Sequence, residues 1–242
     1  MALLLPQFLL IFKVIYPFEF DLMSYSGIAR FYKLIEKITI GSALLDARLA
    51  HLELLAAGSM IQNALLVGEG NGSFLLPFAQ RFPNTQITVL DESITMLNIA
   101  RKRLESAGID IERIQFRQAD VTMELPVQGS YDLMVTLFFF DNFEEATVRR
   151  IVWALQCICT PSAQWLLSDF QVPASGWRHF RARVWLKILY TFFRCVAKIP
   201  ARSLSPSEAI LAVTDFKPVA RKTCCGDMLY STLFQRQVSC PK

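Results

Sequence analysis

Three glycines are packed into five positions directly after a run of aliphatic residues. The stretch LLVGEGNGSF, residues 65–74, places Gly68, Gly70 and Gly72 where an apolar strand is expected to end. Glycine weakens strands and helices, so its presence here indicates a backbone that turns sharply or approaches a ligand closely. Asp91 ends the next apolar segment, where a carboxylate can accept hydrogen bonds from both hydroxyls of a ribose. These residues together predict a site for a nucleoside-containing cofactor.

The spacing of the glycines argues against a dinucleotide. The dinucleotide fingerprint is G-x-G-x-x-G, whereas the spacing here is G-x-G-x-G, with Ser73 in place of the last glycine. Glu69 lies inside the turn, where its carboxylate would repel a diphosphate and tolerate a cation. S-adenosylmethionine carries an ammonium and a sulfonium group and has no phosphate, so charge favours it over NAD. A P-loop is excluded because no Gly-Lys-Ser/Thr follows.

Strands and helices alternate along the chain around these residues. Strands apolar on both faces predict a parallel sheet covered on both sides. We expect a Rossmann-like, doubly wound α/β sheet of about seven strands, mostly parallel, with helices on both faces and an antiparallel strand in a C-terminal hairpin that turns at Gly226-Asp227. The predicted strands are 63–70, 83–91, 114–120, 131–140, 164–172, 217–225 and 229–237, and the predicted helices are 26–57, 73–82, 92–108, 142–159 and 206–213.

The composition is apolar for a chain of 242 residues, with 53% hydrophobic residues and 19 Phe. The most apolar stretch, residues 1–20, is interrupted at Pro6, Gln7 and Lys13, so it is too short to span a bilayer. It is expected either to lie on the domain or to act as an interfacial anchor. Six cysteines without a CxxC pair, and two histidines, predict free thiols in a reducing cytoplasm and no metal site.

Four motifs in the same order and spacing resemble class I S-adenosylmethionine-dependent methyltransferases, in particular the branch with the ubiquinone and menaquinone C-methyltransferases. The motifs are ALLVGEGNGSF, VLDESITMLNIARKRL, FRQAD and YDLMVTLFFFDNF, and the resemblance runs from about residue 63 to residue 172. It implies S-adenosylmethionine as the cofactor and S-adenosylhomocysteine as the product. The predicted C-terminal hairpin also fits this family.

The resemblance also implies roles for individual residues. The glycine turn would lie along the methionine moiety, Asp91 would hold the ribose, and Asp120 would contact the adenine, although a turn cap is an alternative role for Asp120. The implied cofactor residues are Gly68, Glu69, Gly70, Asn71, Gly72, Asp91, Glu92, Ser93, Met96, Asp120, Val121, Thr136 and Leu137.

Methyl transfer from a sulfonium needs mainly alignment, and a base is required where the acceptor must lose a proton. Asp141 follows the fourth strand and is the best-placed candidate, with His179 as the second. Capping the helix that begins near Phe143 is an alternative role for Asp141. Asp169 ends the fifth strand and is interpreted as structural.

The acceptor is predicted to be hydrophobic. In residues 181–198 a narrow basic stripe runs along an otherwise apolar helix, which suits core packing, a hydrophobic lid or contact with an anionic membrane. The candidates for the acceptor pocket and lid are Tyr25, Tyr32, Phe138, Phe139, Trp177 and Trp185.

We therefore predict one structural domain, with a hydrophobic segment and helical cover at 1–62, a methyltransferase domain at 63–242, and a lid insertion at about 176–203. The predicted activity is C- or O-methylation of a hydrophobic small molecule by a cytoplasmic monomer or homodimer, with peripheral contact to the inner face of a membrane as an option. The alternatives are an RNA-modifying methyltransferase, a catalytically silent partner protein and, on fold alone, a nicotinamide dehydrogenase. The basic residues are too dispersed to favour nucleic acid.

Overall fold

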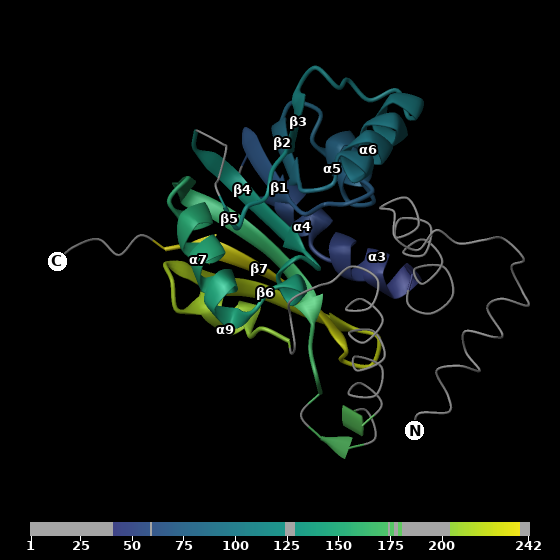
Figure 1. Cartoon of the computed structure of the whole chain (residues 1–242). Coiled ribbons are helices and arrows are strands. Elements are labelled where there is room, and N and C mark those ends of the chain that lie inside the picture. The colour runs from purple at the N-terminus through teal and green to yellow at the C-terminus, as the bar shows by residue number, and fades with distance from the viewer. Residues whose placement is uncertain are drawn as a thin grey trace, which may run out of the picture.

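The computed structural model describes residues 41–58, 60–123, 129–173, 175–176, 179–180 and 204–237 (Figure 1). Most of the expected cover at 1–62 and of the insertion at 176–203 lies outside these residues. Among the described residues, no helix is both long enough and apolar enough to cross a membrane.

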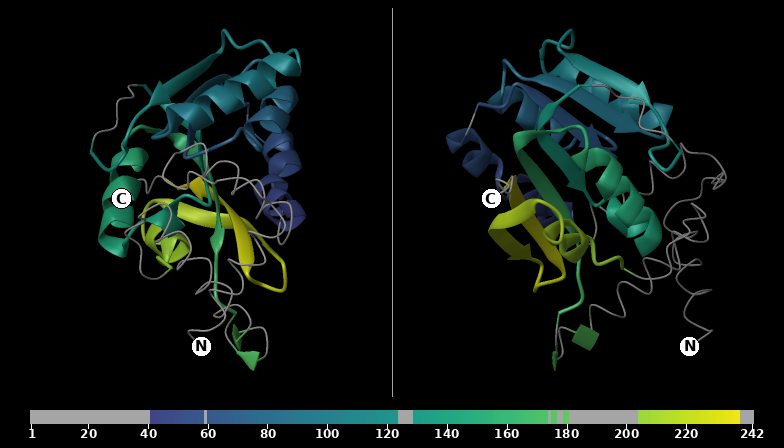
Figure 2. Two further views of the ribbon diagram at one scale, coloured as in Figure 1. Left: turned by 45° about the vertical axis from the view of Figure 1, so that its right-hand side comes forward. Right: turned by 90° about the vertical axis from the view of Figure 1, so that its left-hand side faces the viewer.

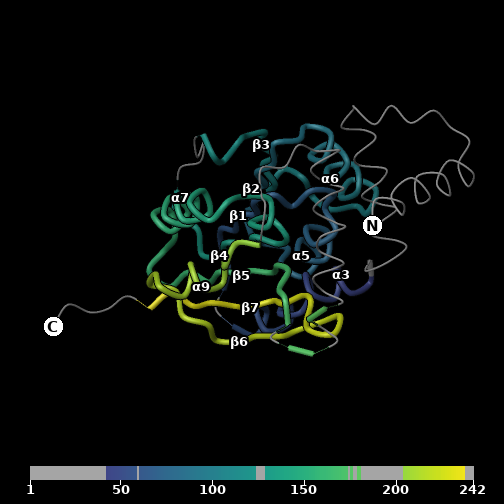
Figure 3. Tube along the Cα trace, turned by 60° about the horizontal axis from the view of Figure 1, so that its bottom comes forward, coloured from purple at the N-terminus to yellow at the C-terminus, as the bar shows by residue number. Residues whose placement is uncertain are grey.

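A single seven-stranded sheet forms the centre of the molecule, with the strand order β3-β2-β1-β4-β5-β7-β6, which can be followed from top to bottom in Figure 3. Neighbours from β3 to β5 are parallel, whereas β7 runs antiparallel to both β5 and β6. The strands are β1 (Asn63–Val67), β2 (Gln86–Asp91), β3 (Ile114–Gln118), β4 (Tyr131–Leu137), β5 (Cys159–Phe170), β6 (Phe216–Cys224) and β7 (Leu229–Arg236). This confirms the predicted Rossmann-like fold with its C-terminal hairpin.

Helices cover both faces of the sheet (Figure 2). Alternate residues of β1 face opposite cores: Leu66 packs with one set of helices, and Leu65 packs with the other. The first core contains side chains from α3 (Gly41–Leu49), α4 (Leu52–Ala57), α5 (Leu75–Arg81) and α6 (Ile94–Ser106). The second contains side chains from α7 (Glu145–Gln156) and α9 (Ser207–Ala212). The arrangement explains why the strands are apolar on both faces.

Helix α6 shows how sequence determines one of these elements. Leu97, Ala100 and Leu104 recur every three or four residues and are buried, so one face of the helix packs on the sheet. Ser93 caps its N-terminus by accepting a hydrogen bond from the backbone amide of Met96 at 3.3 Å. Gly108 follows its end with φ of +70°, in the left-handed conformation that terminates many helices. The predicted stop is therefore confirmed.

Two helix predictions differ from the structure. The described part of the expected 26–57 helix is two helices, α3 and α4, separated at Ala50 and His51. The imidazole Nε2 of His51 is hydrogen-bonded to the carbonyl oxygen of Ser231 in β7 at 3.0 Å, which ties the break to a distant strand. The expected 142–159 helix ends at Gln156 because Cys159 already belongs to β5, paired with Tyr131 of β4.

Candidate cofactor and acceptor site

The glycine turn lies between β1 and α5, and its three glycines have positive φ angles of 67°, 68° and 76°. They differ in their surroundings. A Cβ on Gly68 would lie 2.3 Å from Cδ2 of Phe139, and one on Gly72 would lie 3.0 Å from Cβ of Ala100 in α6. A Cβ on Gly70 would meet no heavy atom within 4 Å among the described residues. Gly68 and Gly72 are thus required for close packing, whereas Gly70 faces open space at the end of the strands.

Asp91 joins the end of β2 to this turn. Its Oδ2 accepts a hydrogen bond from the Gly70 amide at 3.0 Å, and its Oδ1 accepts one from the Ser93 amide at 2.9 Å. Burial raises the pKa of Asp91, and these two backbone donors partly offset that rise. The structure therefore brings the glycine turn, Asp91 and the start of α6, with Glu92, Ser93 and Met96, to one edge of the sheet.

Glu69 is buried within the turn and holds the start of α5. Its Oε1 accepts hydrogen bonds from the backbone amides of Phe74 at 2.8 Å and Leu75 at 3.0 Å. A carboxylate here satisfies amides that have no partner within the helix. Burial is the largest influence on the pKa of Glu69 and raises it, while the charge of Arg48 lowers it. Asn71 is also buried in this turn.

Arg48 of α3 is a site residue that sequence reasoning missed. Its side chain is buried and donates a hydrogen bond from Nη1 to Ser73 Oγ at 2.7 Å, just behind the glycines. The guanidinium also lies over the ring of Phe138, 5.4 Å from its centroid. Its charge lowers the pKa of both Glu69 and Asp141, so it acts as a shared counter-charge. No local motif marks it, because its partners come from other segments.

The two remaining pairs of predicted cofactor residues, Asp120 with Val121 and Thr136 with Leu137, differ in their exposure. Asp120 is exposed, and its Oδ1 accepts hydrogen bonds from the amide and hydroxyl of Thr122 at 2.8 and 2.7 Å, which is the turn-capping arrangement. Val121 beside it is partly buried. Thr136 is wholly buried, and its Oγ1 accepts a hydrogen bond from Trp165 Nε1 at 2.9 Å. The Thr136 side chain is therefore part of the buried core, and the Leu137 side chain is also buried.

The chain bends sharply after β4. Phe138 has a positive φ of 54°, rare for an aromatic residue, and its amide donates to the carbonyl oxygen of Ser168 at 2.8 Å. Phe139 then packs against Gly68, and Asp141 follows in a 3₁₀ turn, η2 (Phe140–Asn142). Strained backbone of this kind is typical of ligand sites.

The expected capping role of Asp141 is wrong. Helix α7 begins at Glu145, its N-cap is Glu144, and no side chain caps it. Asp141 instead lies partly buried beyond β4, where Asn142 Nδ2 donates to its Oδ1 at 3.2 Å. Burial raises its pKa to about 7, with Arg48 acting in the opposite direction. A carboxyl group with this pKa can exchange a proton near neutral pH.

Asp169 lies at the end of β5 in a polar network that sequence reasoning also missed. It is 1% exposed, and its Oδ2 accepts a hydrogen bond from Ser207 Oγ at 2.8 Å. The Ser207 hydroxyl is hydrogen-bonded in turn to the Tyr230 hydroxyl at 2.8 Å, and both of these residues are buried. The pKa of Asp169 is raised well above its usual value, first by burial and next by the charge of Asp141.

The remaining predicted residues are scattered or fall outside the described part. His179 Nδ1 is hydrogen-bonded to the carbonyl oxygen of Pro173 at 2.8 Å, and no interaction links it to Asp141 among the described residues. Tyr25, Tyr32, Trp177 and Trp185 lie outside the described residues.

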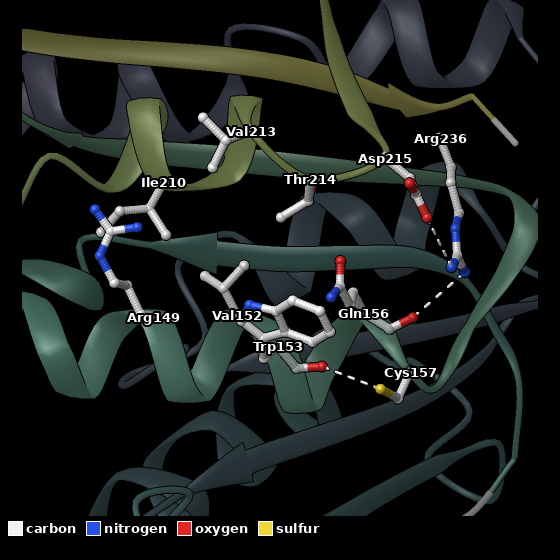
Figure 4. Close-up of a pocket in the computed structure, with 10 residues that line it drawn as sticks. All are labelled: Arg149, Val152, Trp153, Gln156, Cys157, Ile210, Val213, Thr214, Asp215 and Arg236. Carbon is white, nitrogen blue, oxygen red and sulfur yellow. Dashed lines mark hydrogen bonds and ion pairs between the residues drawn. The ribbon is translucent and has the colours of Figure 1, made fainter. Parts of the chain in front are cut away.

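A cleft of about 460 Å³ lies elsewhere, between α7, α9 and the end of β7 (Figure 4). Trp153 and Val213 line it and are largely exposed, and Asp215 reaches Arg236 across one end at 3.4 Å. None of its lining residues belongs to the predicted site.

The comparisons with known proteins agree with this geometry. Residues 64–162 match the methyltransferase domain family. The chain is 27% identical over 153 residues to a demethylmenaquinone methyltransferase of Thermus thermophilus, covering 63% of this chain and 66% of that protein. It is 30% identical over 155 residues to the enzyme of the same name from Deinococcus radiodurans, covering 63% and 61%. The matched segment thus spans slightly less than two thirds of either relative.

The fold is shared with an O-methyltransferase family 2 protein of Planctomyces limnophilus solved with apigenin, at a TM-score of 0.67 and 16% identity over 86% of this chain and 62% of that one. Fold and family match together identify a class I, S-adenosylmethionine-dependent methyltransferase domain in this chain.

Proposed function

We propose that the protein binds S-adenosylmethionine and transfers its methyl group to a hydrophobic small molecule, at carbon or oxygen. The observation that carries the choice of cofactor is the position of the Glu69 carboxylate. In a dinucleotide site, the first amides of the helix after the glycine turn receive a pyrophosphate. Here the Phe74 and Leu75 amides already donate to Glu69, so a diphosphate would meet a carboxylate in place of free donors.

The residues of the turn fit a cofactor without phosphate. Open space beside Gly70 admits a ligand along the backbone, and the Glu69 and Asp91 carboxylates favour the cationic methionine end and the ribose hydroxyls, respectively. The cofactor supplies an activated methyl group on a sulfonium. The chain then needs to align an acceptor with it and to exclude water. We propose Phe138 and Phe139, at the bend after β4, as part of the acceptor pocket.

Binding measurements test the choice of cofactor. Calorimetric titration with S-adenosylmethionine, S-adenosylhomocysteine and NADH is expected to show binding of the two sulfur ligands and none of NADH. Asp91→Ala is expected to weaken that binding by about tenfold or more, since it removes a group that accepts hydrogen bonds in a partly buried site. Asp110→Ala, at an exposed turn before β3, is the matched control. Tight NADH binding, or an Asp91→Ala variant that binds as the wild type does, would contradict the proposal.

The acceptor class is tested separately. The relatives are named for demethylmenaquinone, so its reduced form in detergent is the first acceptor to try, followed by smaller phenols and a polar control such as a short RNA hairpin. Formation of S-adenosylhomocysteine with the apolar acceptors and not with RNA is the expected result. Methylation of RNA would favour the nucleic-acid alternative, and binding without turnover on any acceptor would favour a silent partner protein.

We further propose peripheral membrane contact through the basic amphipathic segment 181–198, which lies outside the described residues. Its sequence combines a narrow basic stripe with a wide apolar face, which is the pattern of helices that lie in a membrane interface. A lipophilic acceptor dissolved in the bilayer would be reached from such a position.

A further inference from the structure

Two acidic residues lie at neighbouring strand ends, at the edge of the sheet that carries the glycine turn. Asp141 follows β4 and Asp169 ends β5, and the amide of Phe138 ties these strand ends together through Ser168. In agreement with this placement, the charge of Asp141 contributes to the raised pKa of Asp169. Two like charges held together in a poorly solvated place rarely both ionise.

The surroundings of the two carboxyl groups are unequal. Within the described residues, the hydrogen-bond partners of Asp169 are neutral, namely the Ser207 hydroxyl and the Phe170 amide. An almost fully buried carboxylate without a cation is costly, so this group takes up a proton. Asp141 is partly exposed, and the positive charge of Arg48 stabilises its ionised form. The negative charge of the pair therefore resides on Asp141.

We propose that Asp141 and Asp169 hold one proton between them, which resides on Asp169, and that Asp141 is the base that takes the proton of an acceptor hydroxyl. This proposal rests on the methyltransferase function proposed above and narrows its substrate class to phenols, hydroquinones and enols. Ser207 and Tyr230 are positioning residues, because their chain of two 2.8 Å hydrogen bonds fixes Asp169.

The chemistry balances with one proton released. The O–H bond of the acceptor breaks and its proton goes to Asp141, while the acceptor attacks the methyl carbon and the S–CH₃ electron pair remains on sulfur. For attack by oxygen, the step is then complete. For attack by a ring carbon, the proton displaced from that carbon restores the hydroxyl as the ring regains aromaticity, so the net release is again one proton.

Several charged and titratable groups face this pair. The charge of Arg48 of α3 lowers the pKa of Asp141, and the same guanidinium lowers the pKa of Glu69 in the glycine turn. Tyr230 of β7 and Glu208 of α9 lie on the side of Asp169, and burial raises the pKa of Tyr230 well above its usual range. Arg221 of β6 pairs with Glu208 at 2.8 Å and lies over the Tyr230 ring.

Infrared spectra of the free wild type and its variants test which carboxyl group carries the proton, without relying on turnover. At pH 8 the wild type is expected to show the carbonyl band of a protonated carboxylic acid. The band should vanish in Asp169→Asn and persist in Asp141→Asn and in the exposed control Asp110→Asn. A wild type without the band, or a band that survives in Asp169→Asn, would overturn the assignment. Thermal melts of each variant establish that it is folded.

The pH profile of turnover gives the second test. Activity is expected to rise with pH as Asp141 ionises, and Asp141→Asn is expected to lose about a hundredfold or more in kcat. Asp169→Asn mimics the protonated acid, so the midpoint of this rise should remain where it is, although kcat falls modestly as the packing changes. If Asp169 were ionised, removing its charge would lower the midpoint, and that result would refute the proposal.

An acceptor that is already ionised provides the third test. With a nitrophenol that is anionic at the assay pH, the loss caused by Asp141→Asn should shrink to a few-fold, since no proton remains to be removed. An equal loss with both acceptors would overturn the role of Asp141 as a base. Failure of the wild type to bind S-adenosylmethionine would refute the proposed function instead, and the infrared result on the free protein would be unaffected.

Discussion

Gly68 and Gly70 share a left-handed backbone but face different surroundings, so their replacement by alanine should separate folding from binding. Gly68→Ala adds a Cβ that would lie 2.3 Å from the Phe139 ring, on top of a strain of about 1 kcal/mol for the backbone. Gly70→Ala carries the strain alone, and its Cβ projects into open space. We expect a much larger fall in melting temperature for Gly68→Ala.

The effects of the two variants on cofactor binding should not follow their effects on stability, and Gly70→Ala is expected to impair mainly binding. The Gly70→Ala methyl group occupies the space that we assign to the cofactor, so affinity for S-adenosylhomocysteine should fall out of proportion to its small change in melting temperature. Titration calorimetry and thermal melts measure the two effects. Equal melting temperatures for the two variants would show that Phe139 yields easily to a side chain on Gly68.

The charge of Asp141 should make the stability of the protein depend on pH. Burial raises its pKa from 3.8 to about 7, so the folded protein favours the neutral acid. The stabilising contribution of that neutral form is complete below about pH 4 and is lost as the pH rises through about 7. Asp141→Asn should therefore raise the melting temperature more at pH 8 than at pH 5. A gain of equal size at both pH values would contradict the raised pKa.

At the scale of elements, α3 is attached to the glycine turn through Arg48. Replacing Arg48 by Met removes its 2.7 Å hydrogen bond to Ser73 and its stacking on Phe138, at a cost of about 2 kcal/mol. It also removes the cation that lowers the pKa of Asp141, so the midpoint of the pH–activity rise should move upward. A domain of this size loses about 2–4 °C in melting temperature per kcal/mol.

The control for this variant is Arg81→Met. Arg81 is largely exposed and pairs with Glu53 at 3.4 Å, an interaction that contributes little in water. Its melting temperature and pH profile are expected to match those of the wild type. A midpoint that stays unchanged in Arg48→Met would mean that Arg48 does not act on Asp141.

The elements also show what the sequence could and could not predict. The strands and the position of the hairpin follow from apolar periodicity and from turn residues, which are local signals. The break between α3 and α4 depends on a bond from His51 to Ser231, 180 positions away. Likewise, the sequence placed Asp141 and Asp169 at strand ends but gave no sign of Ser207 and Tyr230, because convergence of α9 and β7 on β5 is a tertiary property.

At the scale of the whole molecule, the proposed membrane contact predicts binding to anionic vesicles that weakens with salt. The net charge of +4 is modest, so the basic stripe of segment 181–198 must supply most of the attraction. Each Lys or Arg near an anionic surface contributes about 1 kcal/mol. Reversing Lys187, Arg194 and Lys198 to Glu should therefore reduce co-sedimentation by about a hundredfold.

A triple variant with the same change in charge separates this local effect from that of net charge. Lys102, Arg150 and Lys222 are exposed on α6, α7 and β6, and their reversal to Glu leaves the stripe intact. If the stripe is the contact, the control variant retains most of its binding to anionic vesicles, whereas the stripe variant loses it. Equal losses in both variants would show that net charge alone draws the protein to the vesicles, and the proposed interfacial helix would then be wrong.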